Sequence, residues 1–107
     1  KDHDFLFSKT SHLPHVISYS LTETLFKKLG DKTFDFSGGS LEDYTRIASS
    51  DPLMWKDIMI SNQQNILESI EDFEVSLTNL KGLIKKKDEK ALVDYFNRVK
   101  ILRDNSV

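Results

Sequence analysis

A row of apolar residues in the second half of the chain constrains its fold more than any other feature. The row alternates steps of four and three residues and consists of Ile66, Ile70, Phe73, Leu77, Leu80 and Ile84. This spacing is typical of a helix that packs along a heptad-type seam. A helix from about Asn62 to Lys86 would be roughly 37 Å long, whereas a compact domain of this size is only about 34 Å across. The seam therefore predicts that a second surface covers its apolar side chains. The most economical source of that surface is another copy of the chain in a homodimer.

Helical spacing recurs through the rest of the sequence, and no stretch shows strand-like alternation. The first row, at steps of four residues, comprises Leu13, Ile17, Leu21, Leu25 and Leu29. We expect Ser11 to cap this helix and Gly30 to end it. Residues 3–9 would form a separate short helix, or a turn that continues into a kinked one. The sequence thus predicts one all-α domain over residues 1–107, with one long central helix.

Polar residues mark the starts of the later helices. Residues 31–40, which include a Gly-Gly pair, are expected to form a loop. Ser40 is expected to cap a short helix over residues 41–47. Asp51, followed by proline, is expected to cap a helix that breaks near residues 61–62. Asp88 is expected to cap the last helix.

The composition argues against several classes of function. With 15 basic and 17 acidic residues the net charge is −2, so there is no basic excess to bind nucleic acid or an anionic membrane. No apolar run approaches the roughly 20 residues that cross a bilayer. The chain has no cysteine, which excludes disulfides and thiolate metal sites and fits a reducing cytoplasm. Because it begins with Lys1, we expect it to be part of a longer protein or a processed chain.

Arg46 and Trp55 flank the predicted helix start at Asp51-Pro52. The guanidinium of arginine grips carboxylates and phosphates through two parallel hydrogen bonds. A planar indole beside an arginine that binds in this way would suit a small anionic ring compound. The simpler interpretations are a surface Arg46 paired with Asp43 one turn earlier, worth about 0 to 1 kcal/mol, and a Trp55 that only fills the core.

His12 and His15 lie three residues apart and share a helix face. A metal site is one interpretation, but zinc needs further ligands and cysteine is absent. Histidines near a helix start more often form hydrogen bonds. The sequence also lacks the Gly-x-Gly-x-x-Gly turn of a dinucleotide site and a convincing pair of nucleophile and base. We therefore expect this chain alone to be catalytically inactive and to bind no cofactor or metal.

The motifs nevertheless carry a resemblance to a known family, the prephenate dehydrogenases. It covers about half of the chain and rests on Ser11-His12-Leu13-Pro14-His15, Gly38-Gly39, Asp43-Tyr44-Thr45-Arg46-Ile47-Ala48, Ser50-Asp51-Pro52-Leu53-Met54-Trp55-Lys56-Asp57-Ile58 and Asn62. Enzymes of this family have an N-terminal Rossmann domain that binds NAD or NADP, followed by a helical domain that dimerises. The resemblance implies that this chain is the helical domain only.

The resemblance also implies an activity, the oxidative decarboxylation of prephenate to 4-hydroxyphenylpyruvate in tyrosine biosynthesis. In that family the matching arginine binds a substrate carboxylate, which implies this role for Arg46. The matching histidine and tryptophan line the substrate pocket, which implies the same for His15 and Trp55, and Asp43 matches an acidic position that helps to organise the site. The catalytic histidine belongs to the N-terminal domain, so no residue here takes its role.

One departure from the family pattern stands beside Asp43. Where the family usually has Arg or Lys, this chain has Glu42, and Ser40-Leu41 replaces the more usual Gly-Phe. The substitution removes a cation that would guide a dianionic substrate. Two alternatives to prephenate dehydrogenase stay open. The first is arogenate dehydrogenase, with the same chemistry on an amino rather than a keto side chain. The second is a non-catalytic helical dimerisation module.

Overall fold

The structure, a computed structural model, describes residues 2–36 and 38–106, and in this part of the chain it contains helices and no strand. The expected all-α class is confirmed. In chain order the elements are α1 (Asp2–Phe7), a π-helical turn η1 (Ser8–His12), α2 (Leu13–Leu29), η2 (Gly30–Lys32), α3 (Gly39–Arg46), η3 (Ile47–Ser49), α4 (Pro52–Ser61), α5 (Gln63–Lys86) and α6 (Glu89–Ser106). The chain divides into two compact units, Lys1–Ile70 and Glu71–Val107, which are described separately below.

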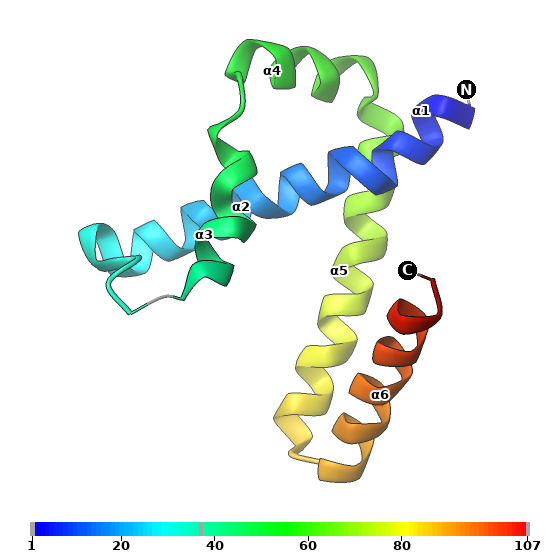
Figure 1. Ribbon diagram of the computed structural model, residues 1–107. Coiled ribbons are helices and arrows are strands. Elements are labelled where there is room, and N and C mark those ends of the chain that lie inside the picture. Colours follow the sequence, from blue (N-terminus) through cyan, green and yellow to red (C-terminus); the bar gives the residue numbers. More distant parts are fainter. Residues whose placement is uncertain (1, 37, 107) are drawn as a thin grey trace. The chain divides into compact units, whose positions relative to one another are not determined.

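The first unit begins with a continuous helical run that includes α1 and α2 (Figure 1). The expected cap is wrong, because α1 runs through η1 into α2 and Ser11 lies inside the π-helical turn. The amide of Leu13 donates to the carbonyl of Ser8, five residues back. This wider turn lies directly before Pro14, whose ring would clash with the carbonyl of Thr10 in a regular α-helix. Residues 2–7 are therefore helical, as the first of the two expected alternatives has them, but α1 is not separate from the helix that follows.

Later helix boundaries follow local chemistry. Gly30 ends α2 with a positive φ of 53°, a conformation in which glycine has no steric penalty. The carboxylate of Asp51 accepts a 3.0 Å hydrogen bond from the amide of Leu53, so it caps α4 as expected. The expected cap at Ser40 is wrong, because α3 starts at Gly39 with Gly38 as N-cap and without a side-chain cap. The expected break after α4 is confirmed at Asn62.

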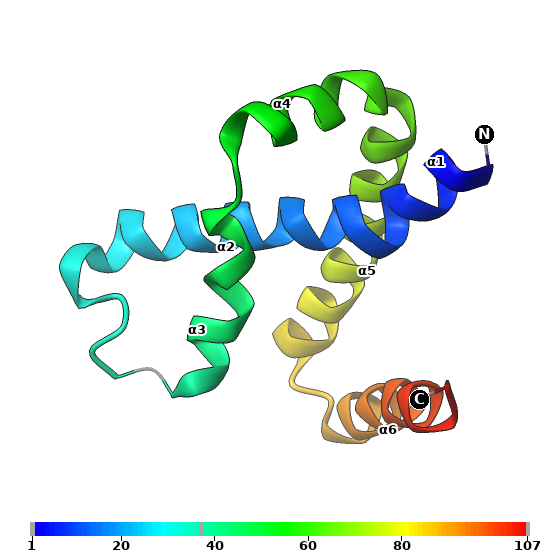
Figure 2. The ribbon, with the colours of Figure 1, turned by 45° about the horizontal axis from the view of Figure 1, so that its top comes forward.

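Helices α2 and α3 cross in the first unit, as Figures 1 and 2 show. Ser18 is buried on α2 and donates a 2.7 Å hydrogen bond to the carbonyl of Tyr44 on α3. The neighbouring Thr45 is also buried and donates to the carbonyl of Leu41. Small hydroxyl side chains at the crossing let the two backbones approach closely. This contact fixes α3 against α2, and with it the position of Arg46 at the end of α3.

The second unit is a helical hairpin formed by the end of α5 and by α6. Lys87 has a positive φ of 54° in the connection, and the carboxylate of Asp88 accepts from the amide of Ala91 at 3.1 Å, which confirms Asp88 as the cap of α6. Leu77 and Ile84 of the seam are more than half exposed here. Over the described residues of both units, the only buried apolar side chains are Trp55 and Ile66, which are 7% and 3% exposed. One copy of the chain therefore leaves most of its apolar side chains partly uncovered.

Candidate functional site

His15 and Trp55 meet in the first unit and form the centre of the candidate site. The imidazole of His15 on α2 stacks on the indole of Trp55 on α4, with ring centroids 3.8 Å apart and planes 22° from parallel. Trp55 is only 7% exposed, whereas His15 is half-buried. The Asp51-Pro52 start of α4 sets the first turn of that helix and so places Trp55, whose amide donates to the carbonyl of Asp51. The indole therefore lies behind the imidazole as a rigid wall.

A backbone contact fixes the ring nitrogens of His15. Its Nδ1 lies 2.8 Å from the carbonyl oxygen of Ser11, and because a carbonyl only accepts, Nδ1 must carry the proton. In the neutral ring this leaves Nε2 as a hydrogen-bond acceptor, and in the protonated ring as a donor. The π-helical turn that displaces Ser11 from its expected role as a cap thus supplies the group that orients His15.

His12 borders the same indole from the side. Its ring centroid is 5.8 Å from that of Trp55, with the planes at 83°. The side-chain amide nitrogen of Asn62 lies 3.2 Å from His12 Nδ1 and 2.8 Å from the carbonyl of Asp4. An amide nitrogen only donates, so His12 Nδ1 accepts and the ring is neutral. Burial, with the neighbouring His15 as the next contribution, lowers the pKa of His12 below its ordinary value.

The indole nitrogen of Trp55 is the polar atom of this cluster that lacks a partner. Trp55 Nε1 is buried and has no hydrogen bond among the residues that the structure describes. Leaving a buried donor unsatisfied costs about 1–3 kcal/mol. The stacking of Trp55 on His15 is therefore maintained against a polar penalty, and the indole acts here through its apolar faces.

Arg46 lies at the end of α3 and lines a cavity of about 310 Å³. The lining residues are Thr22, Phe26, Phe34, Glu42, Thr45, Arg46, Ala48 and Ser49. Among residues 2–36 and 38–106 the guanidinium forms no ion pair, so the predicted surface pair with Asp43 is absent. Asp43 instead lines a separate hollow with Ser40 and Tyr44. The cation of Arg46 is thus available to a ligand.

The structure brings together two of the four predicted site residues, His15 and Trp55. Arg46 and Asp43 lie on α3, which packs on α2 near Ser18, one turn after His15. Asn62 is the residue whose contribution the sequence did not reveal, since its amide joins His12 to α1 and also accepts from Asn65 at 2.9 Å. Its two signals in the sequence were its position at the predicted helix break and its place among the residues that carry the family resemblance. The described residues contain no cluster of three His, Asp or Glu that could hold a metal ion.

Fold and site together define a class: an all-helical domain that leaves apolar side chains uncovered, carries a histidine–tryptophan cluster, and has on α3 an arginine without an ion pair among the described residues. Residues 1–98 match the family described as "Prephenate dehydrogenase, dimerization domain". The chain belongs to the prephenate dehydrogenase family. None of the helices that the structure describes is both long and apolar enough to cross a membrane.

Three relatives illustrate the match. The chain is 37% identical over 97 residues to the cyclohexadienyl dehydrogenase of Zymomonas mobilis, covering 88% of the chain and 33% of that protein. It is similar to the crystal structure of the A. aeolicus prephenate dehydrogenase in complex with hydroxyphenyl propionate and NAD+, with 44% identity, a TM-score of 0.87 and coverage of 96% and 37%. It is also similar to the Synechocystis arogenate dehydrogenase, with 25% identity, a TM-score of 0.87 and coverage of 99% and 40%. The chain spans about a third of the length of its relatives.

Proposed function

We propose that this chain is the helical, substrate-binding part of an enzyme that oxidatively decarboxylates prephenate to 4-hydroxyphenylpyruvate with NAD+ or NADP+. The reaction would serve tyrosine biosynthesis in the cytoplasm. A preceding Rossmann domain would bind the nucleotide, since this chain lacks the glycine-rich turn. The observation that carries the proposal is the fixed His15–Trp55 stack, which presents one imidazole nitrogen from a rigid wall.

Arg46 is the proposed anchor for a substrate carboxylate. Prephenate carries two carboxylates, and a bidentate contact with an arginine fixes both position and orientation. The guanidinium has no ion-pair partner among the described residues, so binding would not have to break an internal pair. Asp43, three residues earlier on α3, is proposed to help organise the site. His15 is proposed to offer Nε2 to the substrate, with Trp55 holding its ring in place.

The chain's own residues would bind and orient the substrate rather than transfer protons. In the overall reaction, a hydride leaves the ring carbon that bears the hydroxyl, one carboxylate leaves as CO2, and the ring becomes a phenol. The oxidised nucleotide supplies the hydride acceptor when it is bound. The group that hydrogen-bonds the ring hydroxyl would come from the preceding domain. Positioning of this kind raises the reaction rate, because it lowers the entropic cost of reaching the reactive geometry.

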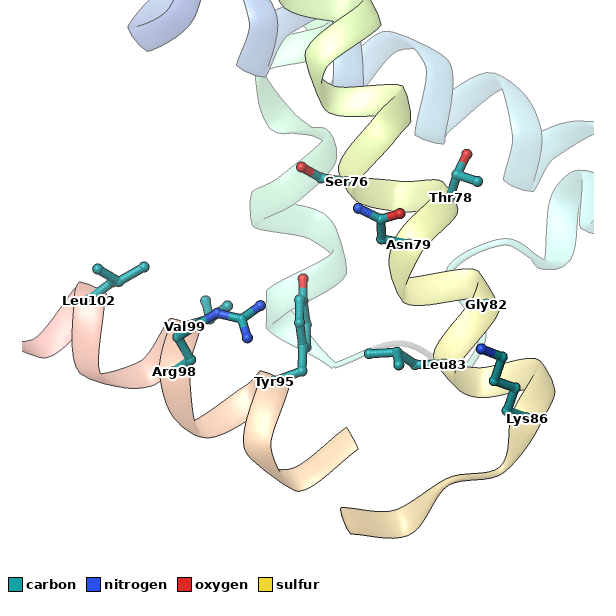
Figure 3. Close-up of a pocket in the computed structure, with 10 residues that line it drawn as sticks. All are labelled: Ser76, Thr78, Asn79, Gly82, Leu83, Lys86, Tyr95, Arg98, Val99 and Leu102. Atoms are coloured by element: carbon teal, nitrogen blue, oxygen red, sulfur yellow. The ribbon is translucent and has the colours of Figure 1, made fainter. Parts of the chain in front are cut away.

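The second unit supports a homodimer. Its α5–α6 hairpin forms an open pocket of about 610 Å³, and Figure 3 shows side chains of both helices around it, Leu83, Tyr95, Val99 and Leu102 among them. Leu102 is 64% exposed. Apolar side chains exposed on a hairpin favour burial against another protein surface. We propose that a second copy of the chain covers this face, consistent with the match to a dimerization domain.

Arogenate dehydrogenase is the second candidate, and one observation favours it. Glu42 lines the same cavity as Arg46. A carboxylate at that place disfavours a ligand that carries only negative charges. The same carboxylate favours a ligand that has an ammonium group beside its carboxylate, because the ammonium and Glu42 attract each other.

The test is turnover by the chain joined to its preceding domain. The purified full-length protein should reduce NAD+ or NADP+ only when prephenate or arogenate is added, with release of CO2. Absence of turnover with both substrates and both nucleotides would contradict the proposal. It would favour a helical dimerisation module without catalytic function.

A further inference from the structure

A network of buried hydroxyl groups attaches the π-helical turn η1 to the first turns of α5, which cross it in Figures 1 and 2. The hydroxyl oxygen of Ser8, the first residue of the turn, lies 3.2 Å from that of Ser69 on α5. The ammonium of Lys9 donates to the same Ser69 oxygen at 3.2 Å, and Ser8 donates to the carbonyl of Phe5 at 2.6 Å. Ser8 and Ser69 are 0% and 1% exposed, so water does not compete for these hydrogen bonds.

The two ends of the hydroxyl network fix the direction of each hydrogen bond in it. An ammonium only donates and a carbonyl only accepts. The single hydroxyl proton of Ser8 goes to the carbonyl of Phe5, so the hydroxyl of Ser69 must donate to Ser8. Ser69 in turn accepts from Lys9. Ser69 is therefore the link between α5 and the turn, and its removal would divide the network in the middle.

A second attachment holds the other end of η1. The ring of His12, the last residue of the turn, accepts from the side-chain amide of Asn62. The carbonyl of Asn62 accepts from the amide of Ile66 in the first turn of α5. Asn62, Ile66 and Ser69 are all buried and follow one another at steps of four and three residues, which places them along one side of the helix. The turn is thus attached to this side at its first and at its last residue.

These attachments bear on the candidate site because η1 carries the carbonyl that orients His15. Single π-helical turns inside α-helices are rare and occur frequently at functional sites. In η1 the hydrogen bond from the amide of Leu13 to the carbonyl of Ser8 spans Ser11, and the carbonyl of Ser11 accepts from Nδ1 of His15. The partner of one ring nitrogen determines which nitrogen carries the proton. The backbone position of Ser8 therefore affects the tautomer of His15.

We propose that Ser69 is a positioning residue for the reaction. Through Ser8 and the π-helical turn it keeps the carbonyl of Ser11 on Nδ1 of His15, so that Nε2 is the acceptor offered to the substrate. The inference rests on the proposed function, in which His15 contacts the substrate. Ser69 is itself buried and does not touch a ligand.

The first measurement is the tautomer of His15 in the full-length protein. It is read from the nitrogen chemical shifts of labelled histidine at about pH 8, where an ordinary histidine is neutral. The wild type should carry the proton on Nδ1, whereas Ser69→Ala should populate both tautomers. Ser8→Ala should do the same and replaces Ser69→Ala if that variant does not fold. Thr33→Val removes another buried hydroxyl, which donates to the carbonyl of Gly30 beyond the end of α2, and should leave the tautomer unchanged.

The second measurement separates positioning from a general loss of structure. Ser69→Ala should lower kcat/KM about 2- to 13-fold, the range that one neutral hydrogen bond accounts for. In a His15→Ala background the same substitution should cause no further loss, because its effect passes through His15. A residue that only stabilises the fold would lower kcat/KM by the same factor in both backgrounds.

Either of two results would overturn the inference while the proposed function stands. One is a proton that stays on Nδ1 of His15 in both Ser69→Ala and Ser8→Ala, and the other is an equal loss from Ser69→Ala with and without His15. If the full-length protein oxidises neither prephenate nor arogenate, the proposed function fails and the role in the reaction fails with it. The tautomer measurement then still shows whether Ser69 orients His15.

Discussion

The imidazole of His15 lies flat on the indole of Trp55, with 3.8 Å between ring centroids, and this contact joins α2 to α4. The indole is nearly inaccessible while the imidazole is half-buried. In the described chain Trp55 therefore contributes mainly by holding His15. The Nδ1 contact with Ser11 fixes the remaining rotation of the ring.

We expect Trp55→Phe to be far less destabilising than Trp55→Ala. Alanine would leave a cavity behind His15 and should cost about 3–5 kcal/mol of unfolding free energy. Phenylalanine keeps a stacking ring and loses no hydrogen bond, because Trp55 Nε1 has no partner among the described residues; the smaller ring should cost about 1–2 kcal/mol. Urea unfolding followed by circular dichroism measures both. Equal losses would show that the stack contributes little.

Stability should fall as the pH drops below about 6.5, the ordinary pKa of histidine. The pKa of His12 is lowered in the folded chain by burial and by His15, against a smaller opposing effect of Asp4. Between the folded and unfolded pKa values, the unfolded chain binds more protons, so stability rises with pH across that window. Protonation would also remove the acceptor for the Asn62 amide.

The control for this prediction is His12→Gln, which keeps an acceptor without a titrating ring. Unfolding free energies of both proteins at pH 5 to 8 would show the difference, and the variant should have the flatter profile in this range. Parallel profiles would remove His12 as the cause.

Much of the fold was predictable because helix ends depend on neighbouring residues. Asp51 and Asp88 bond to amides two and three residues away, and Gly30 needs only its own freedom at positive φ. The predictions that failed also concern helix starts. Ser11 has the right chemistry for a cap, but the backbone passes Pro14 by a π-helical turn. At α3 the helix begins at Gly39, before Ser40 could cap it.

The site was less accessible to sequence reasoning because its contacts join distant segments. The motif around His15 and the motif around Trp55 were each recognisable, but the stack between them depends on how α2 and α4 pack. Local reasoning offered Asp43 as the partner of Arg46. The structure instead places Glu42, not Asp43, in the cavity with Arg46, together with Phe26 and Phe34 from other segments.

A single carboxylate on the hairpin face should break the proposed dimer. Leu102 lines the α5–α6 cavity and is exposed in one copy, so Leu102→Asp should leave the monomer folded but make its burial against a partner unfavourable. Light scattering of the wild-type chain at micromolar concentration should give the mass of a dimer, and that of the variant the mass of a monomer. Asn97→Asp adds the same charge to the exposed surface of α6 outside the cavity and should remain dimeric. A monomeric wild type would contradict the proposal.

Replacing His15 by asparagine should weaken substrate use moderately in the full-length enzyme. Asparagine keeps polarity but loses both the stack on Trp55 and the fixed ring nitrogen. A neutral hydrogen bond contributes about 0.5–1.5 kcal/mol, so kcat/KM should fall about 2- to 13-fold. The affinity for the nucleotide should be unchanged. A loss greater than that in Arg46→Ala would reverse the proposed ranking of the two residues.

The most direct test of the account is the kcat/KM of full-length Arg46→Ala with prephenate and with arogenate. Arg46 faces its cavity without an ion-pair partner in the described chain, and a charge-assisted bidentate contact is worth about 1.5–3 kcal/mol. We predict a loss of roughly 10- to 150-fold for each substrate that the wild type oxidises, an unchanged affinity for the nucleotide, and only partial recovery in Arg46→Lys. An Arg46→Ala enzyme with the kcat/KM of the wild type would show that Arg46 does not bind the substrate.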